Sequence, residues 1–224
     1  MKTLILTLAG LFLLAVPTFA ASPAASTKDT VKVQTALSAS GVASRETNLG
    51  NLIADALKQT GRTQIALLPA DEIDGNAQIP AWKVEISTIV AALRYAADPS
   101  DTVVVLSLTG AQLLKVAERS VSRAPQPFDG FLQVSGLQIR YNPAQSAGGR
   151  VSLVGIGGGE LDAAKTYRVA VSRPLAAGSL GYFQIFGQKD ITEDTGVSIS
   201  KSLGSYLAAH PSITTTVEDR ITTR

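Results

Sequence analysis

The chain has 224 residues, with 20 lysines and arginines against 18 aspartates and glutamates, a single histidine and no cysteine. This balance excludes the broad basic field that nucleic-acid binding or attraction to an anionic membrane requires. Without cysteine, disulfides and a cysteine-linked lipid anchor are excluded, and with one histidine, neither a zinc site nor a Ser-His or Cys-His nucleophile is expected.

Residues 1–20 have the layout of a secretory signal peptide. Lys2 is the only charge, Leu4–Val16 is an apolar run, and small residues lead up to Ala20. The run is too short for a membrane span, which needs roughly 20 apolar residues, although a retained anchor is the alternative. Residues 21–30 are expected to be a flexible tether, and residues 31–224 one domain in the periplasm or outside the cell.

The first half of the domain carries the signals of two strands and two helices. Thr47 or Asn48 can cap a helix in which Leu49, Leu52 and Ile53 begin an apolar stripe at helical spacing. The expected strands cover Val31–Thr35 and Ile65–Leu68, and the expected helices cover Asn48–Gln59 and Val84–Ala97.

The second half alternates more often between strands and turns. Gly157–Gly159 is expected to be a hairpin turn rather than a phosphate loop, because a strand and not a helix follows it. His210 follows a helix and precedes a proline, so it is expected to cap that helix rather than bind a metal. The expected helices cover Ala111–Ser120, capped by Thr109, and Ser198–Ala209, and the expected strands cover Val103–Leu108, Val151–Val154, Lys165–Val171 and a short part of Val217–Arg224.

The stretch Asp129–Tyr141 is expected to organise the domain. It opens on an Asp-Gly turn, alternates apolar and polar residues, turns again at Ser135-Gly136 and resumes the alternation. This pattern predicts strand, bend and strand with one buried face. Phe131 sits where the first strand begins, so its ring can face a ligand or close the core.

These elements mix helices and strands without strict alternation, and several strands are joined as hairpins. The sequence therefore predicts an α+β fold with mixed β-sheet layers flanked by helices.

Three further groups could carry chemistry. Asp71, Glu72 and Asp74 form a tight acidic group, but their spacing is not that of a calcium loop, so a solvated turn is expected rather than a metal site. Arg45 can reach a ligand anion or pair with the adjacent Glu46. Asn51 can lie on the surface of its helix or bond a loop.

Four segments, in order, resemble the C-terminal domain of the 5'-nucleotidase family. The most distinctive sequence among them is Phe-Leu-Gln-Val-Ser-Gly, in the third segment. Together the four segments span essentially residues 31–224. The segments are Arg45–Leu57, Leu108–Leu113, Gly130–Gly136, and Lys165–Val171 with the loop Gly178–Tyr182.

In that family this domain recognises substrate. The resemblance implies that a base is held between two aromatic rings, that arginines and an asparagine hold the phosphate side, and that an acid binds the ribose. Hydrolysis in the family resembles two-metal phosphoesterase chemistry and belongs to a separate N-terminal domain, which this sequence lacks. No catalytic residue, metal ligand or cofactor is therefore expected here.

Only some of the family's substrate-binding residues have a counterpart in this chain. Phe131 matches the first stacking ring, Arg45 the arginine before the helix, and Asn51 the asparagine within it. Acidic Asp71 and Glu72 replace the family's arginine loop, the second ring falls near Pro174, and the ribose acid falls at Leu180. Each unmet polar partner costs roughly 1–3 kcal/mol of binding, so the phosphate side is degraded.

Three functions remain open. The favoured one is an exported, non-catalytic module that binds a nucleotide, a nucleoside, another planar ligand or a peptide, with Phe131 and Tyr182 facing it. The second is the specificity half of a split phosphohydrolase, working with a separate metallophosphoesterase chain. The third is a structural or protein-interaction domain in which Phe131 belongs to the core.

Overall fold

The computed structural model describes residues 29–224. The expected signal peptide and almost all of the expected tether lie outside the described residues. Strand β1 already begins at Thr30, the last residue assigned to the tether. Within residues 29–224 no helix is both long enough and apolar enough to cross a membrane.

A five-stranded mixed sheet forms the middle of the molecule. Its order is β12-β6-β11-β3-β7, in which β3 and β11 run parallel and the other neighbours are antiparallel. All five residues of β3 are buried because helices or strands cover both faces of this sheet. The bounds are Ile65–Pro69 for β3, Thr102–Thr109 for β6, Leu132–Ser135 for β7, Thr166–Ser172 for β11 and Ile191–Ser198 for β12.

Three smaller sheets surround this central sheet. A four-stranded sheet has the order β10-β9-β8-β14, a three-stranded sheet has the order β13-β1-β5, and β2 pairs with β4. The bounds are β1 Thr30–Val33, β2 Leu37–Ser38, β4 Gln78–Ile79, β5 Trp82–Glu85, β8 Leu137–Tyr141, β9 Val151–Ile156, β10 Gly159–Glu160, β13 Ser212–Ile213 and β14 Ile221–Thr223. The expected α+β fold with mixed sheet layers is confirmed.

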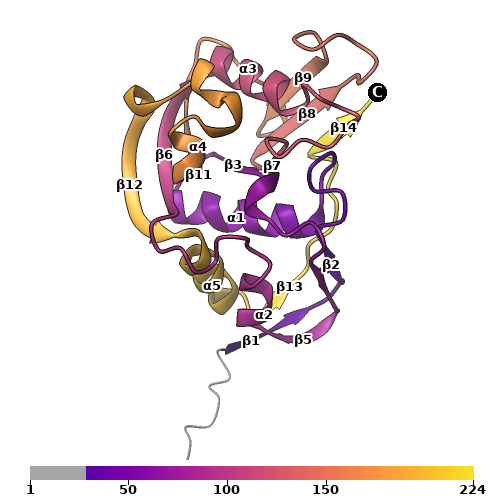
Figure 1. Cartoon of the computed structure of the whole chain (residues 1–224), viewed down its shortest axis with the longest axis vertical. Helices are drawn as coiled ribbons and strands as arrows, with labels where there is room; N and C mark the ends of the chain where they lie inside the picture. Colours follow the sequence, from indigo (N-terminus) through magenta and orange to yellow (C-terminus); the bar gives the residue numbers. More distant parts are fainter. Residues whose placement is uncertain (1–28) are drawn as a thin grey trace, which may run out of the picture.

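Helices cover both faces of the central sheet (Figure 1). Helix α1 crosses the middle of the view, α3 lies above it with β8 and β9, and α2 and α5 lie below it. The helices are α1 Asn48–Gly61, α2 Ile86–Val90, α3 Gly110–Ser120, α4 Arg173–Ala176 and α5 Ile199–Ala209, with short 3-10 turns η2 Ala70–Glu72, η3 Ser179–Gln184 and η4 Gln188–Asp190.

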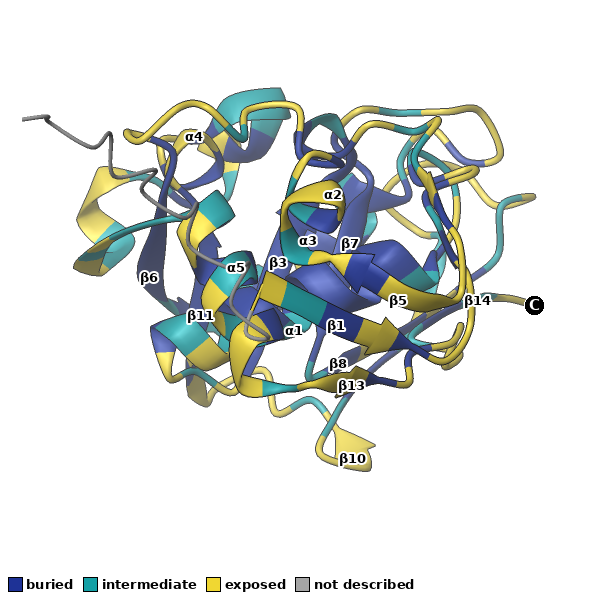
Figure 2. Cartoon of the chain, turned by 90° about the horizontal axis from the view of Figure 1, so that it is seen from below, coloured by how far each residue is buried: buried dark blue, intermediate teal, exposed yellow. Residues whose placement is uncertain are grey.

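The apolar side chains form two cores, one on each face of the central sheet. The α1 core joins Leu52 and Leu57 of α1 to Leu203 of α5, and the α3 core joins Val116 of α3 to Ile139 of β8. Strand β3 divides its residues between them, because successive side chains point to opposite faces of a sheet. Seen from below, α1 and β3 lie in the buried centre of the molecule (Figure 2).

Helix ends follow the capping signals in the sequence. The Thr47 hydroxyl accepts a hydrogen bond from the Gly50 amide, and Thr109 with Gln112 forms a capping box at α3. His210 caps α5, and its ring stacks on Tyr206 with centroids 4.2 Å apart. The expected cap at His210 is therefore confirmed.

Two longer segments differ from the elements expected from the sequence. The helix expected over Val84–Ala97 is instead strand β5, the short helix α2 and a series of turns, because Trp82–Glu85 pairs along β1. Strand β12 was not expected, since its residues are mostly polar and half-buried or exposed.

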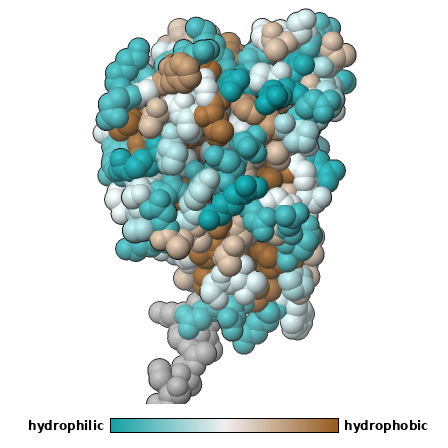
Figure 3. Space-filling view, in the orientation of Figure 1, coloured by the Kyte–Doolittle hydropathy of each residue, from teal (hydrophilic) through white to brown (hydrophobic). Residues whose placement is uncertain are grey.

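The surface is a mosaic of hydrophilic and hydrophobic patches in the space-filling view (Figure 3). The large apolar side chains that are exposed come from separate elements: Trp82, Tyr95, Leu114, Phe183 and Val217. Scattered apolar residues of this kind are ordinary on protein surfaces.

Candidate functional site

The expected strand, bend and strand over Asp129–Tyr141 is confirmed as β7 and β8. Gly136 makes the bend with a φ of +73°, and a Cβ there would lie 2.0 Å from the Gln64 carbonyl oxygen. The bend passes the chain from one sheet to another, because β7 pairs with β3 and β8 pairs with β9. Strand β7 is buried on both faces, so only β8 shows the alternation expected of one buried face.

Phe131 lies in the α3 core with 1% of its surface exposed. Its backbone amide donates to the Phe128 carbonyl, and its own carbonyl accepts from the Ala70 amide. The ring thus closes the core, which is the second of the two arrangements left open by the sequence. Contact between Phe131 and a ligand stays a prediction, and it requires this ring to leave the core.

Tyr182 is also part of the α3 core and is fully buried. Its ring stacks on Phe186 with centroids 5.7 Å apart, and its hydroxyl donates to the Gly130 carbonyl over 2.8 Å. Burial raises the pKa of this phenol far above its ordinary value. The exposed ring of this loop is the next residue, Phe183, at 68%.

Arg45 does not pair with Glu46. Its Nε and Nη2 both donate to the Ser40 carbonyl, at 3.1 and 3.0 Å. Arg45 lines a cleft of about 430 Å³, together with Ser38 and Ser40, the start of α1, and Val217 and Ile221 of the tail. We call it the Arg45 cleft.

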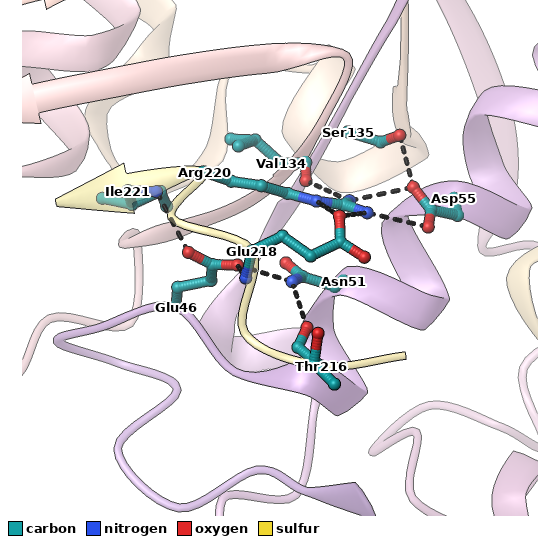
Figure 4. Close-up of polar contacts among 9 residues, drawn as sticks. All are labelled: Glu46, Asn51, Asp55, Val134, Ser135, Thr216, Glu218, Arg220 and Ile221. Carbon is teal, nitrogen blue, oxygen red and sulfur yellow. Dashed lines mark hydrogen bonds and ion pairs between the residues drawn. The ribbon is translucent and has the colours of Figure 1, made fainter. Parts of the chain in front are cut away.

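Asn51 is fully buried and bonds the C-terminal tail (Figure 4). Its Nδ2 donates to Glu46 Oε1 over 2.6 Å and to the Thr216 carbonyl over 3.0 Å. The carboxylate of Glu46 also accepts from the backbone amides of Glu218 and Ile221. Of the two positions considered for Asn51, the one that bonds a loop is therefore confirmed.

Gln133 is the residue that sequence reasoning missed. It is fully buried in β7, and its Oε1 accepts from the Thr47 amide over 2.9 Å. Its Nε2 donates to the carbonyls of Val42 and Arg45, at 3.0 and 2.8 Å. Gln133 thus holds the loop before α1 against the central sheet. The sequence signal for this role was a polar residue placed between the apolar residues Leu132 and Val134. Because the strand is buried on both faces, such a side chain must find hydrogen-bond partners within the protein.

The four expected site residues therefore do not share one cavity. Arg45 lines the Arg45 cleft, Asn51 lies behind it in the contact between α1 and the tail, and Phe131 and Tyr182 belong to the α3 core. Two hydrogen bonds to backbone carbonyls link these regions. Gln133 of β7 donates to the Arg45 carbonyl, and Tyr182 donates to the Gly130 carbonyl just before β7.

Acidic residues gather where β3 ends and β6 and β7 begin. The acidic cluster consists of Asp71, Glu72, Asp101 and Asp129, whose charges act on one another. Glu72 is only 2% exposed, so the expectation of a solvated turn is wrong for this residue. Among residues 29–224, no group of three or more His, Cys, Asp or Glu side chains is arranged to hold a metal ion.

Burial and mutual repulsion alter the ionisation of this acidic cluster. Burial, followed by the charge of Asp101, raises the pKa of Glu72 from 4.5 to about 8. Burial, followed by the charge of Asp129, raises the pKa of Asp71 from 3.8 to about 6. A protonated Glu72 can donate to Asp101, whose buried Oδ1 meets no other donor in the described part of the chain.

Comparisons with known proteins give one consistent result. The family model of the 5'-nucleotidase C-terminal domain matches residues 23–188. The structure resembles the 5'-nucleotidase precursor from Thermus thermophilus, with a TM-score of 0.78 and 32% identity, over 86% of this chain and 39% of that one.

Curated relatives agree with this match. The 5'-nucleotidase of Diplobatis ommata is 25% identical over 79% of this chain and 33% of its own length. The trifunctional nucleotide phosphoesterase protein YfkN of Bacillus subtilis is 29% identical over 69% of this chain and 11% of its own length. The chain thus spans a third or less of these two relatives, and it belongs to the family of 5'-nucleotidase C-terminal domains.

Proposed function

We propose that this chain is an exported, non-catalytic recognition module that binds a nucleoside or a similar planar ligand in preference to a phosphorylated one. Membership of the 5'-nucleotidase C-terminal domain family supports the ligand class. The relatives are named for action on nucleotides, and aromatic faces stack on any base.

The observation that carries the preference is the acidic cluster. It occupies the end of the central sheet where the sequence resemblance places an arginine loop, and the Asp71 amide bonds the Asp129 carbonyl there. At neutral pH Asp71 is mostly ionised, since its pKa is about 6. A phosphate brought to this end would meet negative charge, whereas an uncharged nucleoside would not.

We expect the ligand to stack on Phe128, which adjoins Asp129 of the acidic cluster, and on the exposed Phe183, rather than on the buried Phe131 and Tyr182. Phe128 is half-buried, and its amide donates to the Ala43 carbonyl in the loop before α1. The Arg119 guanidinium lies 4.6 Å from the centre of its ring. Phe183 is exposed, and its backbone packs against Gly178.

The proposal assigns no hydrolysis to this chain. Two-metal phosphoesterase chemistry needs several carboxylate, histidine and asparagine ligands around a pair of ions. The whole sequence holds a single histidine, and that residue caps α5.

Titrating the purified chain with adenosine and with AMP tests the proposal. Adenosine should bind more tightly than AMP, and Phe183→Ala should weaken it while leaving the unfolding temperature nearly unchanged. Asp71→Asn removes a negative charge, so it should reduce the difference in affinity between adenosine and AMP. Equal or tighter binding of AMP would overturn the preference. Absence of binding by either ligand at millimolar concentration would favour a structural or interaction domain.

A second candidate is the specificity half of a phosphohydrolase. The observation that favours it is the greater length of the relatives, because the chain covers only 33% of one 5'-nucleotidase and 39% of another. A separate metallophosphoesterase chain would then supply the metals. Mixing the two proteins should raise phosphatase activity towards nucleotides above that of the catalytic chain alone, and an unchanged rate would count against this candidate.

Export to the periplasm or the outside of the cell is part of the proposal. It rests on the signal-peptide layout of residues 1–20. Sequencing the N-terminus of the protein purified from its natural host should find a start near Ala21. A start at Met1 would contradict export by cleavage.

A further inference from the structure

A second cleft opens at the opposite end of β3 from the acidic cluster. It has a volume of about 740 Å³, within the range of small-molecule sites. The end of α1, the bend between β7 and β8, the turn between β9 and β10, and the tail line it. Because Arg62 stands at its rim, we call it the Arg62 cleft.

The charges in the Arg62 cleft do not cancel. Arg220 donates to both oxygens of Asp55, at 2.8 and 2.9 Å, and to the carboxylate of Glu218 (Figure 4). These two acids are thereby engaged by one guanidinium. Lys58 and Arg62 also line the cleft, and neither forms an ion pair with another described residue. Three cations against two anions leave a net positive charge.

Arg62 adopts a backbone conformation that favours glycine. It follows α1 with φ 49° and ψ 49°, the left-handed position at which many helices end. The amides of Arg62 and Thr63 bond the carbonyls of Gln59 and Lys58, so the helix end needs no cation to satisfy it. A long charged side chain at this position adds a conformational cost, and such costs concentrate at functional sites.

The opposite wall allows close approach. Gly157 and Gly158 line the cleft at the turn between β9 and β10. Neither has an atom of another described residue, apart from its chain neighbours, within 4 Å of where a Cβ would be. Backbone without side chains can therefore approach a ligand closely. The expected hairpin turn at this glycine run is present.

From this arrangement we propose that the Arg62 cleft binds a small oxyanion-bearing molecule, a phosphate or a polycarboxylate, through Lys58 and Arg62. The guanidinium offers paired N–H donors that match phosphate or carboxylate oxygens, and the ammonium offers a second positive charge. Gln59, Gln138 and the backbone at Gly157 supply neutral contacts. This site is independent of the proposed nucleoside site, which lies at the other end of β3.

Calorimetric titration of the whole chain at low ionic strength tests the proposal, with inorganic pyrophosphate and citrate as probes. At least one probe should bind saturably, and which one binds separates phosphate from carboxylate recognition. Arg62→Gly should weaken binding by about tenfold or more, as should Lys58→Gln. Lys115→Gln is the matched control, because Lys115 is an exposed lysine on α3 that does not line the cleft.

Arg62→Gly also separates binding from folding. Glycine suits the left-handed position, so the unfolding temperature should stay the same or rise while affinity falls. The proposal is overturned if neither probe binds at millimolar concentration, or if Arg62→Gly binds as tightly as the unmodified chain. An equal loss in Lys115→Gln would overturn it as well. Failure of adenosine to bind bears only on the other site. An NMR titration with the same two probes places their binding in this cleft if the amide signals of Thr63, Gly136 and Gly158, which line it, shift.

Discussion

Replacing Glu72 by glutamine should remove much of the pH dependence of folding stability between about pH 5 and 8. Glu72 is buried, and the charge of Asp101 acts on its carboxyl group. Its pKa rises from 4.5 in the unfolded chain to about 8 in the fold. The folded protein therefore holds a proton that the unfolded chain releases over this range.

The sign of the effect follows from that proton. The contribution of Glu72 is complete below pH 4.5, decreases as the pH rises, and is lost once the pH passes the folded pKa of about 8. At about 1.36 kcal/mol per pKa unit, the gap corresponds to at most about 5 kcal/mol. The raised pKa values of Asp71 and Asp101 act in the same direction.

Urea unfolding at several pH values measures this contribution. Glutamine can donate to Asp101 at any pH, so at about pH 8 the variant should be more stable than the unmodified chain by roughly 2–5 kcal/mol, and at about pH 5 the two should agree within about 1 kcal/mol. Glu160→Gln, at an exposed glutamate of β10, should leave the pH dependence unchanged. Parallel stability curves for Glu72→Gln and the unmodified chain would refute the reasoning.

Three further predictions, made with five variants, probe other parts of the fold. Phe131→Ala should cost about 3–5 kcal/mol in urea unfolding, and the exposed Phe183→Ala less than about 1 kcal/mol; equal costs would contradict the burial of Phe131. Gly136→Ala should cost more than about 2 kcal/mol because its Cβ meets a backbone oxygen, whereas Gly158→Ala, with open space, should cost about 1 kcal/mol in thermal unfolding. Gln133→Ala should cost about 3 kcal/mol and accelerate amide exchange in residues 42–47; unchanged exchange there would exclude its role in holding that loop.

Periodic elements with clear end signals could be predicted from the sequence. Helix α1 was expected over Asn48–Gln59, and in the structure it runs from Asn48 to Gly61. The prediction was close because the apolar stripe and the Thr47 cap are both local sequence signals. Strand β12 could not be expected. It is an edge strand that pairs only with β6 among the described strands. The side chains of Thr192 and Thr195 donate hydrogen bonds to β6 carbonyls, so polar residues help to hold the strand in place. Its sequence therefore shows no alternation of apolar and polar residues.

The site was less accessible to sequence reasoning than the fold. An aromatic residue at the start of a strand satisfies the same pattern whether it faces a ligand or the core. Phe131 and Tyr182 are buried together only because the fold brings η3 to Gly130, beside the α3 core. The Arg62 cleft joins α1, the bend at Gly136 and the tail, which are far apart in the sequence. No local pattern reports such a meeting, because it depends on the pairing of β14 with β8.

The polar contacts between α1 and the tail also bear on how the protein is synthesised. Asn51 and Asp55 bond partners that are translated 165 residues later, and Glu46 bonds an amide 175 residues later. The ribosome therefore releases α1 long before its buried polar side chains can find their partners. A nascent chain stopped before Thr216 should expose α1 to chaperones and proteases, even with every other helix already made.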